Sequence, residues 1–247
     1  MVELSPAGTF VVTAAGEHRT INLGDGSSVA LNGNSRVWLA SGDGREAELV
    51  RGEALFNIRH DSQRPFVVRL GKDRIQDLGT VFNVVRDHRT LKVEVAEGAV
   101  RYRRGGNGLQ LKAGQTMAIS PAGDAVVGRK HPSAIAAWRV RKLVYEAEPV
   151  SEVASELGRN LGVSISVAPA LAPQRFTGSV HFAGNAKDVI PQFASAIGAK
   201  ARKTRGRWLI ERDASSPRRI SHPDRTTDGP ALNVALSGPL TAEFAGR

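Results

Sequence analysis

The sequence predicts a mainly β protein that continues into a smaller α+β region. From Phe10 to about Val127, short runs alternate apolar and polar residues, and turn sequences rich in Gly, Asn and Asp separate these runs. From about residue 131, strand patterns alternate with amphipathic helix patterns instead. The chain has 247 residues, of which 41% are hydrophobic, so it is long enough for one large domain or two ordinary ones.

The first region, residues 1–130, is predicted to be all β. The expected strands are Arg19–Leu23, Ser28–Leu31, Arg36–Ala40, Arg45–Val50, Ala54–Ile58, Phe66–Leu70, Val81–Val85, Leu91–Val95, Val100–Arg103, Leu109–Leu111 and Thr116–Ile119. Turns such as GDG at 24–26 and NGN at 32–34 supply residues that tolerate positive φ. Short strands at even spacing are typical of a sandwich, a barrel or a solenoid. We favour a solenoid-like stack, with a sandwich as the alternative.

The second region, residues 131–213, contains two similar units. Residues 144–163 align with residues 180–199, so that strand, turn, helix and closing glycine coincide. Each helix places apolar residues at i, i+3, i+4 and i+7, and Asn185 is a predicted N-cap of the second helix. We therefore expect a duplicated βαβ domain, with one layer of helices on a small sheet. The edge strand of such a sheet offers unpaired N–H and C=O groups to a partner.

The tail, residues 214–247, is rich in Ser, Pro, Arg and Asp, which predicts disorder. Within it, ALNVALSGPL at 231–240 is compatible with a short strand or a short helix. The sequence does not decide between these two structures.

The motifs of common catalytic and metal sites are missing from the sequence. The absence of cysteine excludes thiol nucleophiles, disulfides and iron–sulfur clusters. The six histidines lack metal-ligand spacing, and neither GxSxG nor SxxK occurs. Glu46 and Glu48 share one strand face, which indicates a solvated sheet surface more than a glycosidase pair. We expect a protein without enzyme activity, metal or cofactor.

One stretch, Leu49 to Val68, combines Arg, Glu, His and Asp in a way that could suggest a catalytic pocket. We interpret it as architecture. The polar residues are expected in turns and on strand faces, and the apolar ones in the core. The polar set is Arg51, Glu53, His60 and Asp61, and the apolar set is Phe56, Ile58, Phe66 and Val68.

The chain is strongly basic, with a formal net charge of +10 at pH 7. The densest patch is Lys200 to Arg207, which is compatible with a solvated strand and turn or with an acidic partner. No aromatic residues interleave with this run, so we do not expect a nucleic-acid partner. The sequence contains no run of 18 apolar residues that would span a membrane.

Several blocks of the first region occur together in a familiar order. They are GEHRTINLGDGSSVALNGNSRV at 16–37, LVRGEALFNIRHDSQRPFVV at 49–68, DLGTVFNVV at 77–85, VEVAEGAVRY at 93–102 and LKAGQTMAI at 111–119. In this order the blocks resemble the FecR family. Residues 137–167 resemble the segment that follows the FecR domain and leads into a secretin/TonB short N-terminal (STN-like) module.

The resemblance implies the periplasmic part of a transmembrane regulator of an extracytoplasmic-function sigma factor. Its implied partner is the periplasmic signalling domain of a TonB-dependent outer-membrane transducer, in iron- or siderophore-type signalling. A site protease would act on the full-length protein, and the sigma factor would be reached through a cytoplasmic segment that this sequence lacks. We expect either a periplasmic fragment of a single-pass inner-membrane protein or an atypical soluble member.

A signal-relay module needs a contact surface, and the second region is the expected place. Its candidate partner-binding residues are Arg139, Arg141, Tyr145, Phe182, Arg205, Arg207 and Trp208. Aromatic and Arg residues dominate binding energy when they lie centrally in an interface. The alternative interpretation of the three aromatic residues is that they belong to the core of this small domain. The alternative function is a carbohydrate- or ligand-binding β domain without catalysis.

Overall fold

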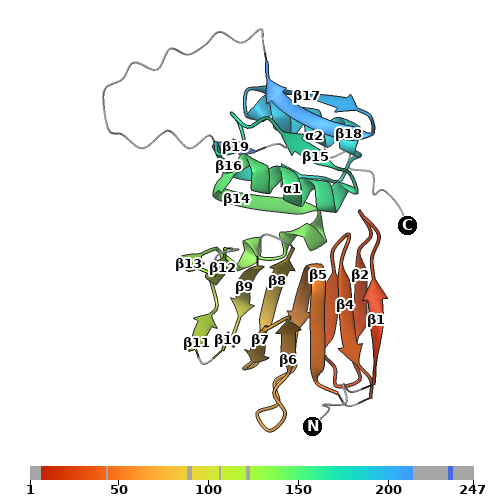
Figure 1. Cartoon of the computed structure of the whole chain (residues 1–247), viewed down its shortest axis with the longest axis vertical. Helices are drawn as coiled ribbons and strands as arrows, with labels where there is room; N and C mark the ends of the chain where they lie inside the picture. Colours follow the sequence, from red (N-terminus) through yellow and green to blue (C-terminus); the bar gives the residue numbers. More distant parts are fainter. Residues whose placement is uncertain are drawn as a thin grey trace, which may run out of the picture. The chain divides into compact units, whose positions relative to one another are not determined.

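The structure is a computed structural model that describes residues 7–213, apart from 43, 88–90, 106 and 121–122, together with residues 233–235 (Figure 1). The chain divides into two compact units, Met1–Ala137 and Trp138–Arg247. The predicted boundary lies after residue 130, and the short helix η1, Pro132–Ala134, contacts a strand of the first unit. Most of the predicted disordered tail lies outside the described residues. No helix among the described residues is long and apolar enough to cross a membrane.

The first unit is all β, as predicted. Its strands are β1 (Gly8–Val12), β2 (Arg19–Asn22), β3 (Ser28–Leu31), β4 (Arg36–Ala40), β5 (Glu46–Asn57), β6 (Val67–Leu70), β7 (Asp73–Asp77), β8 (Val81–Arg86), β9 (Leu91–Glu97), β10 (Ala99–Arg104), β11 (Asn107–Lys112), β12 (Gln115–Ile119) and β13 (Ala125–Arg129). The predicted bounds of β3 and β4 match the structure. The strands predicted at 45–50 and 54–58 form the single strand β5.

Strand β5 is continuous because Gly52 lets it bend between two layers. Gly52 has a φ of 95°, which L side chains rarely adopt. A Cβ at this position would lie 2.3 Å from the Oγ of Ser35, so the segment at Ser35 lies too close for any residue other than glycine. The first half of β5 pairs with β4 and β6, and the second half pairs with β3 and β8.

The two layers are built by alternating hairpins. After β5, the hairpin β6–β7 joins the layer of β1 and β4, and β8–β9 joins the layer of β2 and β3. The hairpins β10–β11 and β12–β13 then repeat this alternation. The chain thus advances along the stack as in a solenoid, but nearly all of its neighbouring strands are antiparallel, as in a sandwich. The result is one curled sheet that combines features of both predicted alternatives.

The core of the first unit lies between these layers. Phe56 and Phe82 stack with their ring centroids 5.1 Å apart, and Phe66 packs beside Phe56. Ile58 and Val68 are also buried. The prediction that the apolar residues of the 49–68 stretch form the core is therefore confirmed.

Strand β7 shows why some strands escape a pattern search. Its sequence is DRIQD, and the residues that point inward are Asp73, Ile75 and Asp77. Both carboxylates are buried, so polar residues occupy the core face of the strand. The other unpredicted strands, β1 and β13, are edge strands, where alternation between a buried and an exposed face is weak.

The second unit contains two helices and two small sheets. Its elements are η2 (Ala137–Val140), β14 (Lys142–Pro149), α1 (Val150–Leu161), β15 (Ile165–Val167), β16 (Arg175–His181), α2 (Ala186–Ala196), β17 (Ala199–Thr204), β18 (Arg207–Arg212) and β19 (Asn233–Ala235). The predicted cap is present, since the side chain of Asn185 accepts a hydrogen bond from the Lys187 amide at 2.8 Å. Gly162 ends α1 with a φ of 70°.

The expected single sheet is wrong. One sheet has the order β14–β16–β19 and the other has the order β15–β18–β17, and α1 contacts strands of both. The strands on either side of each helix therefore belong to different sheets. Periodicity shows which residues of a strand share a face, but strand pairing is a long-range choice that it cannot report.

Candidate functional site

The seven candidate partner-binding residues fall into two groups. Arg139, Arg141, Arg205 and Arg207 are exposed. Tyr145, Phe182 and Trp208 are only 6%, 4% and 6% exposed. The ring of Tyr145 packs edge-on against Phe176, which packs against Phe193 on α2. The three aromatic residues thus belong to the core, because a small unit needs its largest side chains there.

The exposed arginines lie in two regions of the second unit, the β17–β18 hairpin and the segment before β14. Arg205 and Gly206 form the turn of the β17–β18 hairpin, with φ values of 48° and 81°. Two positive φ values are typical of a type I′ turn, which matches the twist of a hairpin. Arg207 follows this turn directly, whereas Arg139 and Arg141 lie on η2 and on the turn before β14.

The tip of this hairpin carries charge that has no counterpart nearby. Further along the hairpin, Lys200 pairs with Asp213 at 2.8 Å and Arg202 pairs with Glu211 at 2.6 Å. At the tip, Lys203, Arg205 and Arg207 are exposed and form no ion pair within the described part of the chain. We call these three residues the basic tip. It is a positive surface that an acidic partner fits.

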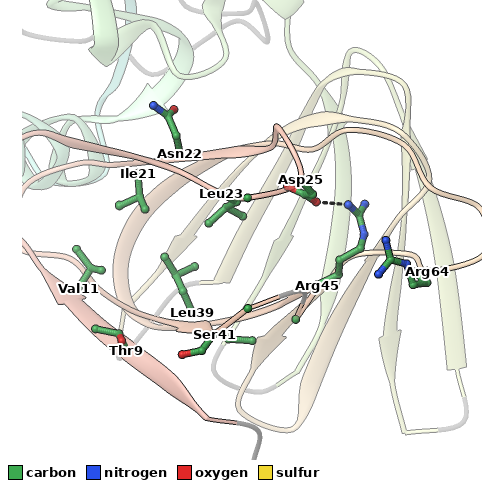
Figure 2. A pocket seen from close by; sticks show the side chains of 14 residues that line it. Thr9, Val11, Ile21, Asn22, Leu23, Asp25, Leu39, Ser41, Arg45 and Arg64 are labelled. Atoms are coloured by element: carbon green, nitrogen blue, oxygen red, sulfur yellow. Dashed lines mark hydrogen bonds and ion pairs between the residues drawn. The ribbon is translucent and has the colours of Figure 1, made fainter.

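The first unit contains a pocket of about 550 Å³ between β1–β4 and β2–β3 (Figure 2). Its apolar lining comes from both layers, and its rim is polar. The apolar residues are Val11, Ile21, Leu23 and Leu39, and the labelled rim residues include Thr9, Asn22, Ser41 and Arg64. A smaller pocket of about 220 Å³ lies among β10–β13. Both pockets therefore lie at ends of the stack, where no further hairpin covers the layers among the described residues.

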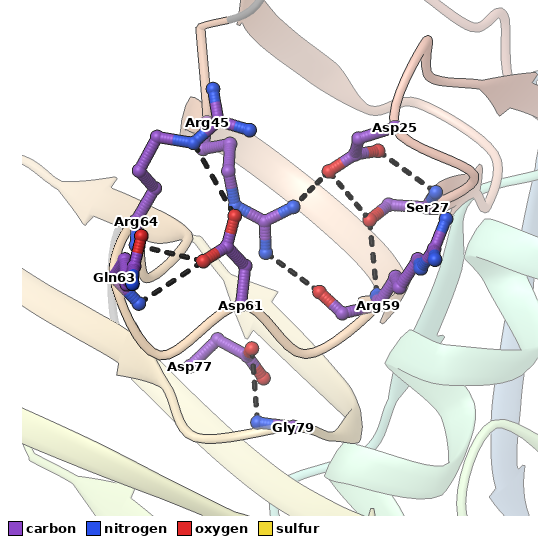
Figure 3. A network of polar contacts seen from close by, with 9 residues as sticks. All are labelled: Asp25, Ser27, Arg45, Arg59, Asp61, Gln63, Arg64, Asp77 and Gly79. Carbon is purple, nitrogen blue, oxygen red and sulfur yellow. Dashed lines mark hydrogen bonds and ion pairs between the residues drawn. The ribbon is translucent and has the colours of Figure 1, made fainter.

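A polar network closes one side of the larger pocket (Figure 3). Arg45 forms an ion pair with Asp25 and donates to the carbonyl of Arg59 at 2.7 Å. Asp25 also accepts from the amide and the hydroxyl of Ser27. The charge of Arg45 is therefore already balanced, and Arg64, which pairs with Asp61 at 3.3 Å, is the more exposed cation of the rim.

The turn HDSQRP at 60–65 is held by the same network. The carboxylate of Asp61 accepts from the amides of Gln63 and Arg64 at 3.0 and 3.1 Å. The hydrogen bond from the Arg64 amide is the main reason that the pKa of Asp61 is lowered. Nearby, Asp77 accepts from the Gly79 amide at 3.0 Å and from the Thr80 hydroxyl, while burial raises its pKa. Asp61 thus fixes a turn, as the architectural interpretation of this stretch predicts, and Asp77 fixes a second turn outside the stretch.

Polar residues from four of the sequence blocks meet on one face of the sheet. Glu53 accepts hydrogen bonds from the side-chain amides of Asn32 and Asn83, at 2.8 and 2.9 Å. Asn83 also contacts Glu94 at 3.3 Å, and Lys130 pairs with Glu94 at 3.0 Å. We call these five residues the polar ladder. Sequence reasoning placed Glu53 on a strand face but did not predict its burial, because its partners are 21 and 30 residues away.

The described residues contain no group of three His, Cys, Asp or Glu side chains that could hold a metal ion. The aromatic residues of the first unit also do not form a stacking platform. Arg69 covers the ring of Trp38 at 5.4 Å, and Tyr102 is buried. Without a metal site or a stacking platform among the described residues, the main features are the polar turns of the all-β stack and the basic tip of the second unit.

This arrangement agrees with the comparison to known sequences. Residues 9–101 match the FecR protein family. The match spans less than half of the chain and includes four of the five blocks that carry the resemblance, wholly or in large part. The second unit lies outside it. No curated protein matches the chain significantly.

Two solved structures share the fold. Both are of a Parabacteroides distasonis protein that is provisionally described as an anti-sigma factor, at 2.50 and 1.65 Å resolution. They are 24% identical to this chain, with TM-scores of 0.75 and 0.74. The matches cover 84% and 83% of this chain and the full length of the solved chains. At this identity the likeness establishes the fold.

Proposed function

We propose that this chain is the periplasmic signal-relay part of a FecR-like regulator of an extracytoplasmic-function sigma factor. The FecR family match over 9–101 carries the proposal. The solved structures support it, because their match extends over 84% of the chain, more than the first unit alone provides. A site protease and the sigma factor would act through parts of the regulator other than the residues described above.

The second unit is the proposed contact surface for the periplasmic signalling domain of a TonB-dependent outer-membrane transducer. Its order of elements, strand–helix–strand twice, supports an STN-like module. The basic tip gives this surface a positive charge that can steer an acidic partner and fix its orientation. The chemistry is binding without catalysis, and the signal is of the iron or siderophore type.

Calorimetry of the full chain with the signalling domain of the transducer encoded beside it tests this proposal. We expect a Kd in the micromolar range or below. The double variant Arg205→Glu/Arg207→Glu should weaken binding about tenfold, which corresponds to about 1.4 kcal/mol. Arg129→Glu is the matched control, since Arg129 is also exposed but lies on β13 of the first unit.

Each outcome has a distinct meaning. Selective weakening by the tip variant supports the relay and locates its surface. Equal weakening by Arg129→Glu would indicate unspecific attraction of a basic protein, which contradicts a contact at the tip. If this chain and the signalling domain are both folded but do not bind each other, the resemblance to the FecR family concerns the fold alone.

A ligand-binding β domain is the second candidate function, and the 550 Å³ pocket favours it. No aromatic ring lines this pocket, so it lacks the stacking surface that sugars prefer, and its mixed lining suits a small ligand with both apolar and polar groups. A ligand that binds only the folded chain would raise its unfolding temperature. Transducer binding that needs no added ligand would favour the relay instead.

A further inference from the structure

The second unit has a strand from the distant tail on the edge of one sheet. Residues 233–235 form β19, which pairs in parallel with β16. Asn233 lies opposite Thr177, Val234 opposite Gly178, and Ala235 opposite Ser179. Figure 1 shows this strand at the side of β16, although more than 50 residues separate them in sequence. The stretch that the sequence left undecided between strand and helix therefore contains a strand.

The other edges of these two sheets carry features that discourage strand addition. The register of β14 shifts between Tyr145 and Glu148, and Ala147 in this bulge has a φ of 50°. Pro149 ends β14 without an N–H group. Bulges and prolines of this kind protect edge strands from unwanted pairing.

The edge of β17 is protected by charge. Its sequence is AKARKT, so Lys200, Arg202 and Lys203 lie along the strand. Lysine-rich edges disfavour pairing with a further strand. The third edge, β15, is only three residues long. Short edge strands offer few groups for pairing.

Strand β16 lacks these features. It runs for seven residues, RFTGSVH, with no proline, and its charged or titratable residues, Arg175 and His181, lie at its two ends. Gly178 lies at its centre, between Tyr145 of β14 and Val234 of β19. A glycine inside a strand often marks a place where another backbone approaches closely. The edge of β16 is therefore the most receptive edge of the unit.

The contact that β19 makes is short. It covers residues 177–179, the middle of the seven-residue strand. Main-chain hydrogen bonds provide the affinity in strand addition, so a longer extended segment would form more of them than β19 does. A longer strand can therefore displace residues 233–235 from this edge.

We propose that the edge of β16 is a strand-addition site. Residues 233–235 occupy it in the free chain, and an extended segment of a partner protein binds there by displacing them. The identity of this partner rests on the proposed function: it is the signalling domain of the transducer. The site itself does not depend on that identity, since it follows from the pairing of β16.

The first experiment tests whether the tail occupies the edge. Val234→Pro removes an N–H group and disfavours a strand at 233–235, whereas Val234→Thr keeps a β-branched residue and serves as the control. Hydrogen exchange of the full chain should become faster in segment 175–181 in the proline variant only. The amides of segment 142–145 on β14, on the other side of β16, provide the internal reference. Unchanged exchange in segment 175–181 would overturn the proposal.

The second experiment tests strand addition by a free segment. The probe is a labelled peptide, PALNVALSG, with the sequence of residues 230–238. A tethered segment has an effective concentration of about 1 mM, so for a peptide Kd of about 100 μM the intact chain should bind about tenfold more weakly than Val234→Pro. Equal affinity for the two proteins, or no binding to the variant, would contradict the proposal.

Competition separates this site from the proposed function. If the signalling domain displaces the peptide from Val234→Pro, the edge of β16 is its binding site. If the signalling domain binds the full chain but leaves the peptide in place, the assignment of this partner to the edge is wrong. If the peptide binds as expected and the signalling domain does not bind at all, the strand-addition site stands and the proposed relay fails.

Discussion

The two units of this chain differ in their buried charges: the first unit buries the carboxylates of Glu53, Asp73, Asp77 and Glu94, and the described part of the second unit buries no charged residue. In the first unit, Glu53 and Glu94 are buried and hydrogen-bonded within the polar ladder. In the second unit, the side chain of Arg202 is 60% exposed in its pair with Glu211. The buried carboxylates of the polar ladder therefore fix strands of the first unit relative to one another, whereas the charged pair of the second unit stays accessible to a partner.

This difference shows that the meaning of a polar residue depends on the layer that surrounds it. A buried carboxylate is costly unless hydrogen bonds or an opposite charge compensate it, so it restricts the arrangements that its neighbours can adopt. An exposed pair is screened by water and contributes little to stability, but it is free to act in recognition. The three variants below test this contrast, from the largest expected effect to the smallest.

Removal of the central carboxylate of the polar ladder should have the largest effect. Glu53→Ala removes the acceptor of the buried Asn32 side-chain amide and leaves the Asn83 amide with only its longer hydrogen bond to Glu94. We expect a loss of about 3 kcal/mol in the free energy of unfolding, because each unpaired buried group costs about 1–3 kcal/mol. Urea unfolding measures this loss.

Glu48→Ala is the matched control on the same strand. Glu48 is half-buried on β5, outside the polar ladder, and its loss should change the free energy of unfolding by only about 0.5 kcal/mol. Similar losses in the two variants would contradict a special role of the polar ladder.

Removal of the charge of Lys130 should have an intermediate effect that depends on pH. Burial by itself would raise the pKa of Glu94, but the charges of Lys130 and Lys92 outweigh it and hold this pKa below the usual value. Lys130→Met removes the larger of the two lysine charges that lower this pKa and leaves the charge of Lys92. We expect a loss of about 2 kcal/mol at neutral pH, because breaking a buried ion pair costs up to about 3–5 kcal/mol and Lys130 is partly exposed.

The sign of the pH dependence follows from the lowered pKa of Glu94. Its ion pair stabilises the folded chain fully above the pKa of an unfolded glutamate, about 4.3, and this stabilisation is lost as the pH falls towards the lower folded value. The difference between the wild type and Lys130→Met should therefore shrink below about pH 4.3. A difference that stays constant down to pH 3 would show that the charge of Glu94 is not involved.

Removal of an exposed pair in the second unit should have the smallest effect. Arg202→Ala breaks the pair with Glu211, and we expect a change of at most about 0.5 kcal/mol, which salt reduces further. Thermal unfolding at low and high salt measures it. A loss of stability as large as that of Lys130→Met would remove the contrast between the two units.

Local patterns account for much of this fold. The alternation of Ser28–Leu31 and Arg36–Ala40 predicted β3 and β4 with their observed bounds, and Asn185 predicted the start of α2. These features depend on neighbours within a few residues, so a short window of sequence contains the information. The basic tip was foreseen in the same way, since Arg205 and Arg207 are in one run.

The pairing of distant segments could not be predicted in this way. Asp77 is buried because two layers close over β7, and Tyr145 is in the core because Phe176 and Phe193 pack against it. Neither fact is visible along the strand itself. A period of two reports two faces, and the rest of the molecule decides which of them is covered.

The sequence by itself determined the class of the first unit, the positions of most strands and helices, and part of its apolar core, namely Phe56, Ile58, Phe66 and Val68. Tertiary structure decided which carboxylates are buried, how the strands of the second unit divide into two sheets, and where residues 233–235 lie. The physical reason is the distance along the sequence over which each effect acts. Periodicity and capping act within a few residues, whereas burial and strand pairing depend on chain segments that are brought together only when the whole unit folds.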